Sequence, residues 1–312
     1  MQFNNTKHMK VNIIGACQTL GCGRDGVQHG PDSLRGSGLI ERLQEYDIEI
    51  SDSGNIYNND SIVCYANKKL KNYEKIADFC ERLATSVCKS LNNGFFPLVL
   101  GGDHSLGIGS VCGAARALGG DDLCVIWIDA HTDINTQDST PTGNIHGMTL
   151  ASALGLGDEQ LSSICGVGAK IKPENIIYIA ARDIDEGEAE IIRQYNIQVF
   201  HMSEIVAEGA DKTIQRIENH LNNLAASKIY LSIDIDVIDP KLAPGTGVPV
   251  PNGIDKNMLL RFIDVIANTG RVRGAELVEV NPTLDDQSNT TTLLAVEIVD
   301  YLVKKILENR IV

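Results

Sequence analysis

The 312-residue sequence contains no apolar run long enough to cross a bilayer, and its polar start at residues 1–10 lacks the apolar core of an export signal. Basic residues are also scarce, because 27 Lys and Arg stand against 41 Asp and Glu, for a formal net charge of -14. Such a surface repels nucleic-acid phosphates and anionic membranes. We therefore expect a soluble, cytoplasmic protein without nucleic-acid or membrane partners, and one that is compatible with a cationic substrate.

None of the eight cysteines belongs to a Cys-x-x-Cys pair, so the sequence gives no sign of a zinc ribbon or a dithiol redox motif. In a chain of this size without an export signal, scattered cysteines favour free thiols in a reducing compartment. Internal repeats, low-complexity tracts and linker-like segments are missing as well. We therefore expect a single domain over residues 1–312.

The composition, with 43% hydrophobic and 22% charged residues, is ordinary for a globular protein with a sizeable core. Short apolar runs without polar alternation predict buried parallel strands at residues 11–14, 96–100, 123–128, 176–180, 229–233 and 275–278. Helical periodicity lies between them, at residues 73–91, 105–118, 187–195, 212–224, 256–267 and 292–307. Strands that alternate with helices predict a doubly wound α/β fold.

Two segments fit neither pattern. The Asn-rich stretch 51–67 predicts a surface connection or an irregular strand. The stretch 239–253, rich in Pro and Gly, is too long for a simple turn, and long ordered loops of this kind often border a functional site.

Polar clusters directly follow three of the predicted strands. They are Gly-Gly-Asp-His-Ser at 101–105, Asp-Ala-His-Thr-Asp at 129–133 and Asp-Ile-Asp at 234–236. Ligands in open α/β sheets bind at the carboxyl ends of strands, so the three clusters are expected at one edge. A rim of unrelated capping residues is the alternative, but so many acids without Lys or Arg between them would repel each other.

A pair of divalent metal ions would offset that repulsion. Two imidazoles and four carboxylates suit an ion such as manganese, and the predicted ligands are His104, Asp129, His131, Asp133, Asp234 and Asp236. Two metals about 3.5–4 Å apart can share one water and lower its pKa toward neutrality. The sequence therefore predicts a hydrolase.

The same segments resemble a known family. The clusters at 101–105 and 129–133, with Ser-Ile-Asp-Ile-Asp-Val-Ile-Asp-Pro at 232–240, are similar to the three signatures of the ureohydrolases, which include arginase and agmatinase. Gly-Val-Gln-His-Gly-Pro at 26–31 and Glu-Val-Asn-Pro at 279–282 extend the resemblance over most of the chain.

The resemblance implies a three-layer α/β/α sandwich around a mainly parallel sheet, two manganese ions per subunit, and a homotrimer or hexamer. It implies that one ion is bound by His104, Asp129, Asp133 and Asp234. The other would be bound by His131, Asp129, Asp234 and Asp236, so that Asp129 and Asp234 bridge the pair.

The loop after the second cluster indicates the substrate. Asn135, Thr140, Thr142 and Asn144 resemble the residues with which arginases bind the α-carboxylate of L-arginine. Asp183, Asp185 and Glu188 resemble the segment that binds the α-amino group. Agmatine has no carboxylate, so L-arginine fits better. Two departures from the arginase pattern are Thr142, where Ser is common, and Glu186, where Pro is common.

The expected reaction is the hydrolysis of L-arginine to L-ornithine and urea. Glu279 would hold the guanidinium while a hydroxide between the metals attacks its carbon. Asp133 would pass the hydroxide's proton to the departing amine, and His146 would exchange protons with bulk water.

Other roles remain open for several of these residues. Glu279 could cap a strand end, His146 could bond to backbone, and Asp183 could equally orient a loop. We expect Asp103 and Asp239 to bond loop amides or metal ligands, and Arg182 to pair with nearby acids.

Other functions remain open as well. The nearest is another amidinohydrolase, acting on agmatine or a guanidino acid. A formiminoglutamate hydrolase, a single-zinc deacetylase of related fold, and a non-catalytic arginine or metal sensor are more distant.

Overall fold

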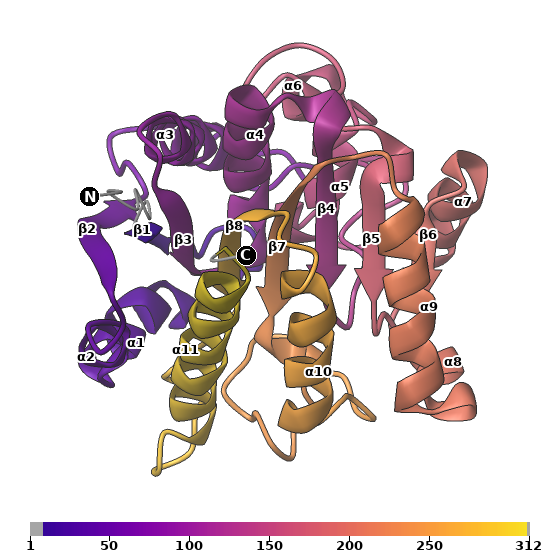
Figure 1. Ribbon diagram of the computed structural model, residues 1–312. Coiled ribbons are helices and arrows are strands. Elements are labelled where there is room, and N and C mark those ends of the chain that lie inside the picture. Colours follow the sequence, from indigo (N-terminus) through magenta and orange to yellow (C-terminus); the bar gives the residue numbers. More distant parts are fainter. Residues whose placement is uncertain (1–8, 311–312) are drawn as a thin grey trace.

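The computed structural model describes residues 9–310, which form a parallel β-sheet between two layers of helices (Figure 1). The sheet has eight strands in the order β2-β1-β3-β8-β7-β4-β5-β6, and every neighbouring pair is parallel. The strands are β1 (Met9–Cys17), β2 (Ile48–Tyr57), β3 (Phe96–Gly101), β4 (Leu123–Ile128), β5 (Ile176–Ile179), β6 (Gln198–Phe200), β7 (Lys228–Asp234) and β8 (Val272–Val278). The expected α/β/α sandwich is confirmed.

The helices divide between the two faces of the sheet. One core cluster joins the sheet to α1 (Gly30–Gly36), α2 (Leu39–Leu43), α8 (Met202–Glu208), α9 (Ala210–Asn223), α10 (Lys256–Ala267) and α11 (Thr290–Arg310). The other joins it to α3 (Tyr73–Asn92), α4 (Gly107–Leu118), α5 (Thr149–Ala153) and α7 (Glu186–Tyr195). The short α6 (Glu159–Ser162) packs through Leu161 in a third cluster with α3 and α4. No helix within residues 9–310 has both the length and the apolar character to cross a membrane.

Burial on both faces explains why the central strands lack polar alternation. Along β4, Cys124, Ile126 and Ile128 belong to the first core, whereas Val125 and Trp127 belong to the second. Side chains alternate across a strand, so a strand covered on both sides is apolar throughout.

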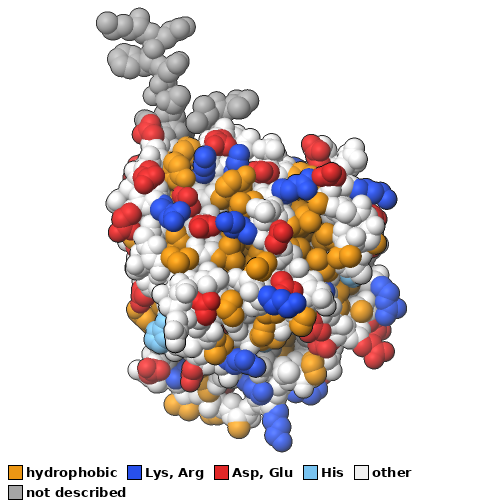
Figure 2. Space-filling view, turned by 90° about the horizontal axis from the view of Figure 1, so that it is seen from below, with side chains coloured by type: hydrophobic (Ala, Val, Ile, Leu, Met, Phe, Trp, Pro, Cys, Tyr) orange, Lys and Arg blue, Asp and Glu red, His pale blue; other side chains and the backbone are white. Residues whose placement is uncertain are grey.

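The strand order brings the polar clusters together. The strands β3, β8, β7 and β4 are neighbours, so the residues that follow them meet at one edge of the sheet. This is the lower edge in Figure 1, toward which the strands point. Figure 2 views the molecule from that side and shows acidic and basic side chains mixed over the face, with hydrophobic side chains between them.

The segment 51–67 divides in two. Its first part belongs to β2, the strand at one end of the sheet, and the rest is a connection without regular structure. The strand β2 is half exposed and has no apolar run, which is why the sequence showed no clear strand there. The stretch 239–253 is the predicted long loop, and a single bridge between Ile238 and Ile254 closes its base.

Candidate metal centre and substrate cavity

His104 is placed by a capped turn at the end of β3. The Asp103 side chain accepts hydrogen bonds from the amides of Ser105 at 3.0 Å and Gly21 at 2.8 Å. It thereby begins the short 3-10 turn His104–Leu106 that leads into α4. As expected, Asp103 bonds loop amides, and Asp239 does the same with Lys241 and Gly253 in the long loop.

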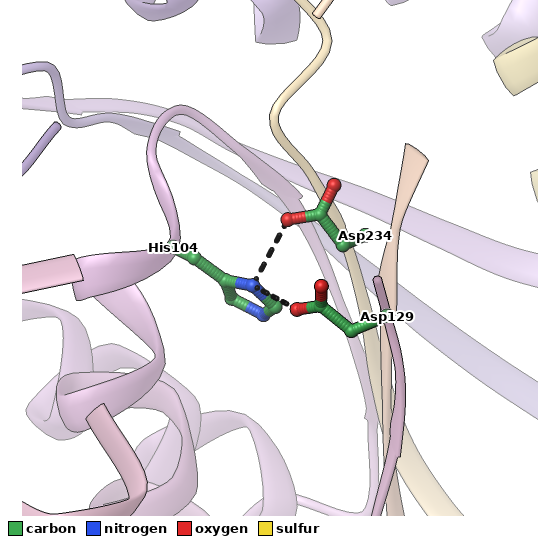
Figure 3. Close-up of side chains that lie close together, drawn as sticks. All are labelled: His104, Asp129 and Asp234. Atoms are coloured by element: carbon green, nitrogen blue, oxygen red, sulfur yellow. Dashed lines mark ion pairs between the residues drawn. The ribbon is translucent and has the colours of Figure 1, made fainter. Parts of the chain in front are cut away.

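The first group of possible metal ligands is His104, Asp129 and Asp234 (Figure 3). The Nδ1 atom of His104 lies 3.0 Å from Asp129 Oδ2 and 3.1 Å from Asp234 Oδ2. Asp133 Oδ2 is 3.2 Å from the same nitrogen. Four predicted ligands therefore converge on one point.

The second group is Asp129, His131 and Asp236. Nδ1 of His131 lies 3.0 Å from Asp236 Oδ2 and 3.4 Å from Asp129 Oδ1. Asp129 thus presents one oxygen to each histidine, the arrangement of a carboxylate that bridges two ions. Asp234 belongs to the first group only, so its predicted bridging role rests on the resemblance.

The charges of the cluster suit a metal pair. Burial, together with neighbouring carboxylates, raises the pKa of Asp133, Asp234 and Asp236, for Asp236 to about 6. Burial lowers the pKa of His104 and His131, but the surrounding carboxylates raise it well above its ordinary value. Crowded acids of this kind hold protons in place of cations, and divalent ions can replace those protons.

Some buried polar atoms inside the cluster also make no hydrogen bonds. His104 Nδ1 and Asp129 Oδ2 are buried and lie 3.0 Å apart, yet neither makes a hydrogen bond. Unpaired buried polar atoms are costly, so their presence points to a missing ligand. The donor set, imidazole nitrogen with carboxylate oxygen, is one that manganese accepts.

The backbone at two site residues is strained. Asp133 has φ of 48° and Glu279 has φ of 62°, in the left-handed region that favours glycine. Such conformations cost about 1–3 kcal/mol and tend to occur at functional sites. Here they aim two carboxylates at the metal cluster's edge.

A cavity of about 160 Å³ opens beside the cluster. Its lining includes every predicted substrate-binding residue, namely Asn135, Thr140, Thr142, Asn144, Asp183, Asp185 and Glu188. His131, Asp133 and His146 are its other polar lining residues, and Pro141, Gly147 and Val248 line the rest of it. The cavity lining contains four acids and no Lys or Arg, which suits a cationic ligand.

Hydrogen bonds fix the acidic residues Asp185 and Glu188 at one end of this cavity. Asp185 caps α7 and pairs with Glu188 in a capping box. Glu188 accepts hydrogen bonds from the amides of Asp185 at 2.9 Å and Ile134 at 3.2 Å. Asn135 Nδ2 donates to Asp185 Oδ2 at 2.9 Å. Glu188 thus ties α7 to the loop that follows the metal ligands.

Lys71 orients Asn144 at the other end. Its Nζ donates to Asn144 Oδ1 at 3.0 Å, while Asn144 Nδ2 donates to the Cys22 carbonyl at 3.2 Å. The segment around Lys71 packs tightly on the loop, since a Cβ at Gly143 would lie 1.9 Å from the Lys68 carbonyl oxygen. The second N–H of Asn144 remains free for a ligand.

Two of the three predicted catalytic residues, His146 and Glu279, are neighbours. His146 Nδ1 lies 3.5 Å from Glu279 Oε1, which also accepts from the His104 amide at 2.9 Å. Burial lowers the pKa of His146, but Glu279 and nearby acids raise it above its ordinary value overall. Glu279 Oε2 is buried without a partner and is free to bind a donor.

Some participants were not singled out from the sequence. Ser232 bonds His104 and lies inside the motif at 232–240, which was the available signal. Thr246 has a buried, unpaired hydroxyl, and it is in the long loop already expected to border the site. Arg182, which we expected to pair with acids, instead donates to backbone carbonyls, those of Asp236, Val237, Val250 and Pro251.

The chain is similar to known proteins over nearly its whole length. The Arginase family model matches residues 9–304 of the chain. The chain belongs to the arginase family. The arginase of Bacillus subtilis strain 168 is 42% identical over 296 residues, which cover 95% of this chain and 98% of that protein.

Solved arginase structures have the same fold. The arginase of Bacillus subtilis superposes with a TM-score of 0.87 at 41% identity, covering 94% of this chain and 98% of that one. The Entamoeba histolytica arginase in complex with L-ornithine gives 0.86 at 30% identity, covering 95% and 99%.

Proposed function

We propose that this protein is an arginase that hydrolyses L-arginine to L-ornithine and urea with two manganese ions. The observation that carries the proposal is the pair of ligand groups joined at Asp129, beside a cavity lined by the substrate residues. Arginases at about 40% identity over most of the chain support it. L-ornithine, bound in the Entamoeba structure, is the expected product.

His104, Asp129, Asp133 and Asp234 would hold one ion, and His131, Asp129, Asp234 and Asp236 the other. Two divalent ions in such a site supply a water of lowered pKa that can attack at neutral pH. The protein supplies the fixed donors. Stacking on Trp127 holds His104, with 3.9 Å between ring centroids, and backbone amides hold the carboxylates of Asp129, Asp234 and Asp236.

The substrate would lie along the cavity with its guanidinium toward Glu279. The unpaired Oε2 of Glu279 can accept a guanidinium N–H at the inner end. Asp183 and Asp185 would attract the α-ammonium, while Glu188 fixes Asp185. Asn135, Thr140, Thr142 and Asn144 offer neutral donors to the α-carboxylate.

Asp133 and His146 would move the protons. Asp133 lies at the edge of the cluster and lines the cavity, so its carboxylate can carry a proton from water to the departing amine. His146 lines the same cavity, and its side chain is 20% exposed, so it can exchange protons with solvent.

A substrate panel tests the proposal. The manganese-loaded protein is assayed for urea release from L-arginine, L-argininamide and agmatine. We expect the highest kcat/KM for L-arginine, since only this compound carries the α-carboxylate. Faster turnover of agmatine would make the protein another amidinohydrolase, and manganese binding without turnover of any of the three would make it a sensor.

The setting of the enzyme is part of the same proposal. One sheet with its flanking helices spans the described residues, so we propose a single domain over residues 1–312. All eight cysteines are free, which suits the cytoplasm. We propose a homotrimer or hexamer from the family resemblance, and light scattering after gel filtration would measure the assembly's mass.

A further inference from the structure

Glu276 is a carboxylic acid inside the second hydrophobic core. It lies on β8 between Ala275 and Leu277, which face the first core, and it is fully buried. Tyr230 donates a hydrogen bond to its Oε2 at 3.1 Å. Burial raises the carboxyl's pKa, although His104 and the hydroxyls of Ser110, Ser232 and Tyr230 oppose that effect. Burying an acid at this position costs free energy, and a residue that served only to fill the core would be apolar.

Glu276 belongs to a row of side chains beneath His104. In the sheet register, Glu276 on β8 pairs with Ser232 on β7, and Ser232 pairs with Trp127 on β4. The Trp127 ring stacks on the His104 imidazole with 8° between the ring planes. Ser232 Oγ lies 2.8 Å from His104 Nε2. Trp127 thus fixes the plane of the imidazole, and Ser232 fixes its rotation within that plane.

The hydrogen-bond directions in this row depend on Glu276. A metal ion needs the lone pair of His104 Nδ1, so the neutral ring must carry its proton on Nε2 and donate it to Ser232 Oγ. The Ser232 proton then needs an acceptor. Glu276 pairs with Ser232 across β7 and β8, both residues are fully buried, and Glu276 Oε1 has no hydrogen-bond partner, so it is available to accept this proton. Without it, the hydroxyl could donate to Nε2 and leave the ring proton on Nδ1, against the metal.

We propose that Glu276 is a positioning residue for the metal centre, which acts through Ser232 to hold His104 with the Nδ1 lone pair directed at Asp129 and Asp234. This inference rests on the proposed metal-dependent function. Partners that orient a ligating histidine typically change metal affinity by roughly 10- to 100-fold when they are mutated.

The two histidine ligands differ in this respect. Nε2 of His131 lies 3.8 Å from Asp183 and has no hydrogen-bond partner within residues 9–310. The His131 side chain is 20% exposed, against 1% for His104. No comparable chain of buried groups holds His131 among the described residues. A change at Glu276 should therefore lower the affinity for the ion at His104 and leave the affinity for the ion at His131 unchanged.

Manganese binding to the full chain, measured by titration calorimetry with Mn²⁺ alone, tests the inference. The variants are Ser232→Ala, Glu276→Gln and the double variant. Tyr230→Phe is the control, because it removes the hydrogen bond to the other oxygen of the same carboxyl, Oε2. A glutamine amide can turn either face to Ser232, so it loses the fixed acceptor. We expect Ser232→Ala and Glu276→Gln each to lower the affinity for one of the two manganese ions by at least roughly 10-fold.

Non-additivity is the decisive readout. Once the Ser232 hydroxyl is gone, Glu276→Gln should cost no further affinity, and Tyr230→Phe should change it far less. Additive losses, equal losses for both ions, or unchanged affinity would overturn the inference. If Glu276→Gln does not fold, Glu276→Asp draws the carboxylate away from Ser232 and should produce the same one-ion loss. Wild-type protein that binds no manganese would instead contradict the proposed function.

Discussion

His146 shows what a single side chain can do in this cavity. It contacts Glu279 and reaches solvent, whereas most other polar groups of the cluster are buried. The sequence located it through the neighbouring Asn144 and Gly147. The contact with Glu279 could not be predicted, because the two residues lie 133 positions apart in the sequence and only the strand order brings the end of β8 to the loop.

Replacing His146 by Asn tests its proton transfer. Asparagine keeps a polar group of similar size but does not titrate near neutrality, so kcat should fall by roughly 10²-fold or more, the range that general acid–base groups contribute. The KM for L-arginine should change little. Steady-state kinetics measure both, with His29→Asn, an exposed histidine, as the matched control. An unchanged kcat would remove His146 from the reaction.

Glu188 predicts a pH dependence of stability. Burial is the largest effect and raises its pKa from 4.5 to about 7. The unfolded chain releases this proton near the ordinary value and the folded protein only near 7, so stability falls as the pH rises through that interval. Glu188→Gln should remove up to ~3 kcal/mol of that decline between about pH 5 and about pH 8.

Urea unfolding of both metal-free proteins across this range measures the difference. The comparison uses the slope with pH, because glutamine also alters the hydrogen bonds to Ile134 and Asp185 by a constant amount. Parallel curves for wild type and variant would contradict the raised pKa.

Individual helices and strands were predictable where burial leaves a recognisable apolar pattern in the sequence. The strand at 123–128 and the helix at 256–267 have their predicted bounds. The edge strand β2 is half exposed, and β6 has only three residues, so neither leaves an apolar run. The helix expected at 105–118 begins instead at Gly107, because the Asp103 cap makes the preceding turn tighter.

Gly102 follows β3 and links its end to the ends of β1 and β8. Its amide donates to the Ala16 carbonyl at 2.7 Å, and its carbonyl accepts from the Glu279 amide at 2.9 Å. A Cβ at this position would lie 1.9 Å from the Gln18 carbonyl oxygen. Gly102→Ala should therefore push the β1 and β3 ends apart and displace both His104 and Glu279.

We expect Gly102→Ala to lose activity and metal affinity and to lower the free energy of unfolding by ~1–3 kcal/mol. Denaturant unfolding and manganese titration measure these effects. Gly36→Ala is the control, since an added Cβ there meets nothing within 4 Å. Full activity in Gly102→Ala would show that the strand ends tolerate the displacement.

The whole molecule is organised around the strand order, which no local pattern in the sequence predicts. Placing β8 and β7 between β3 and β4 brings ligands from distant segments together at a single edge. The motifs and their expected location at strand ends were predictable, because ligands collect there in parallel sheets. The hydrogen-bond partners, such as Ser232 and Lys71, depend on tertiary contacts and were not.

Metal binding at this edge should stabilise the entire chain. Folded protein binds the ions and the unfolded chain does not hold the cluster together, so saturation at about 100 times Kd adds ~2.7 kcal/mol per ion. Removing metal with a chelator should lower the Tm, and manganese should restore it. The Tm of Asp129→Asn should change little when manganese is removed or restored. Asp60 is an exposed carboxylate away from the cluster, so the Tm of Asp60→Asn should change as in wild type. Equal responses of wild type and Asp129→Asn would argue against a shared site.

The most direct measurement is urea release from L-arginine as manganese is titrated into metal-free protein. The account predicts that urea and L-ornithine form in equal amounts, and that activity rises to a maximum at two manganese ions per chain. A protein that binds manganese in that ratio yet releases no urea from L-arginine would contradict it.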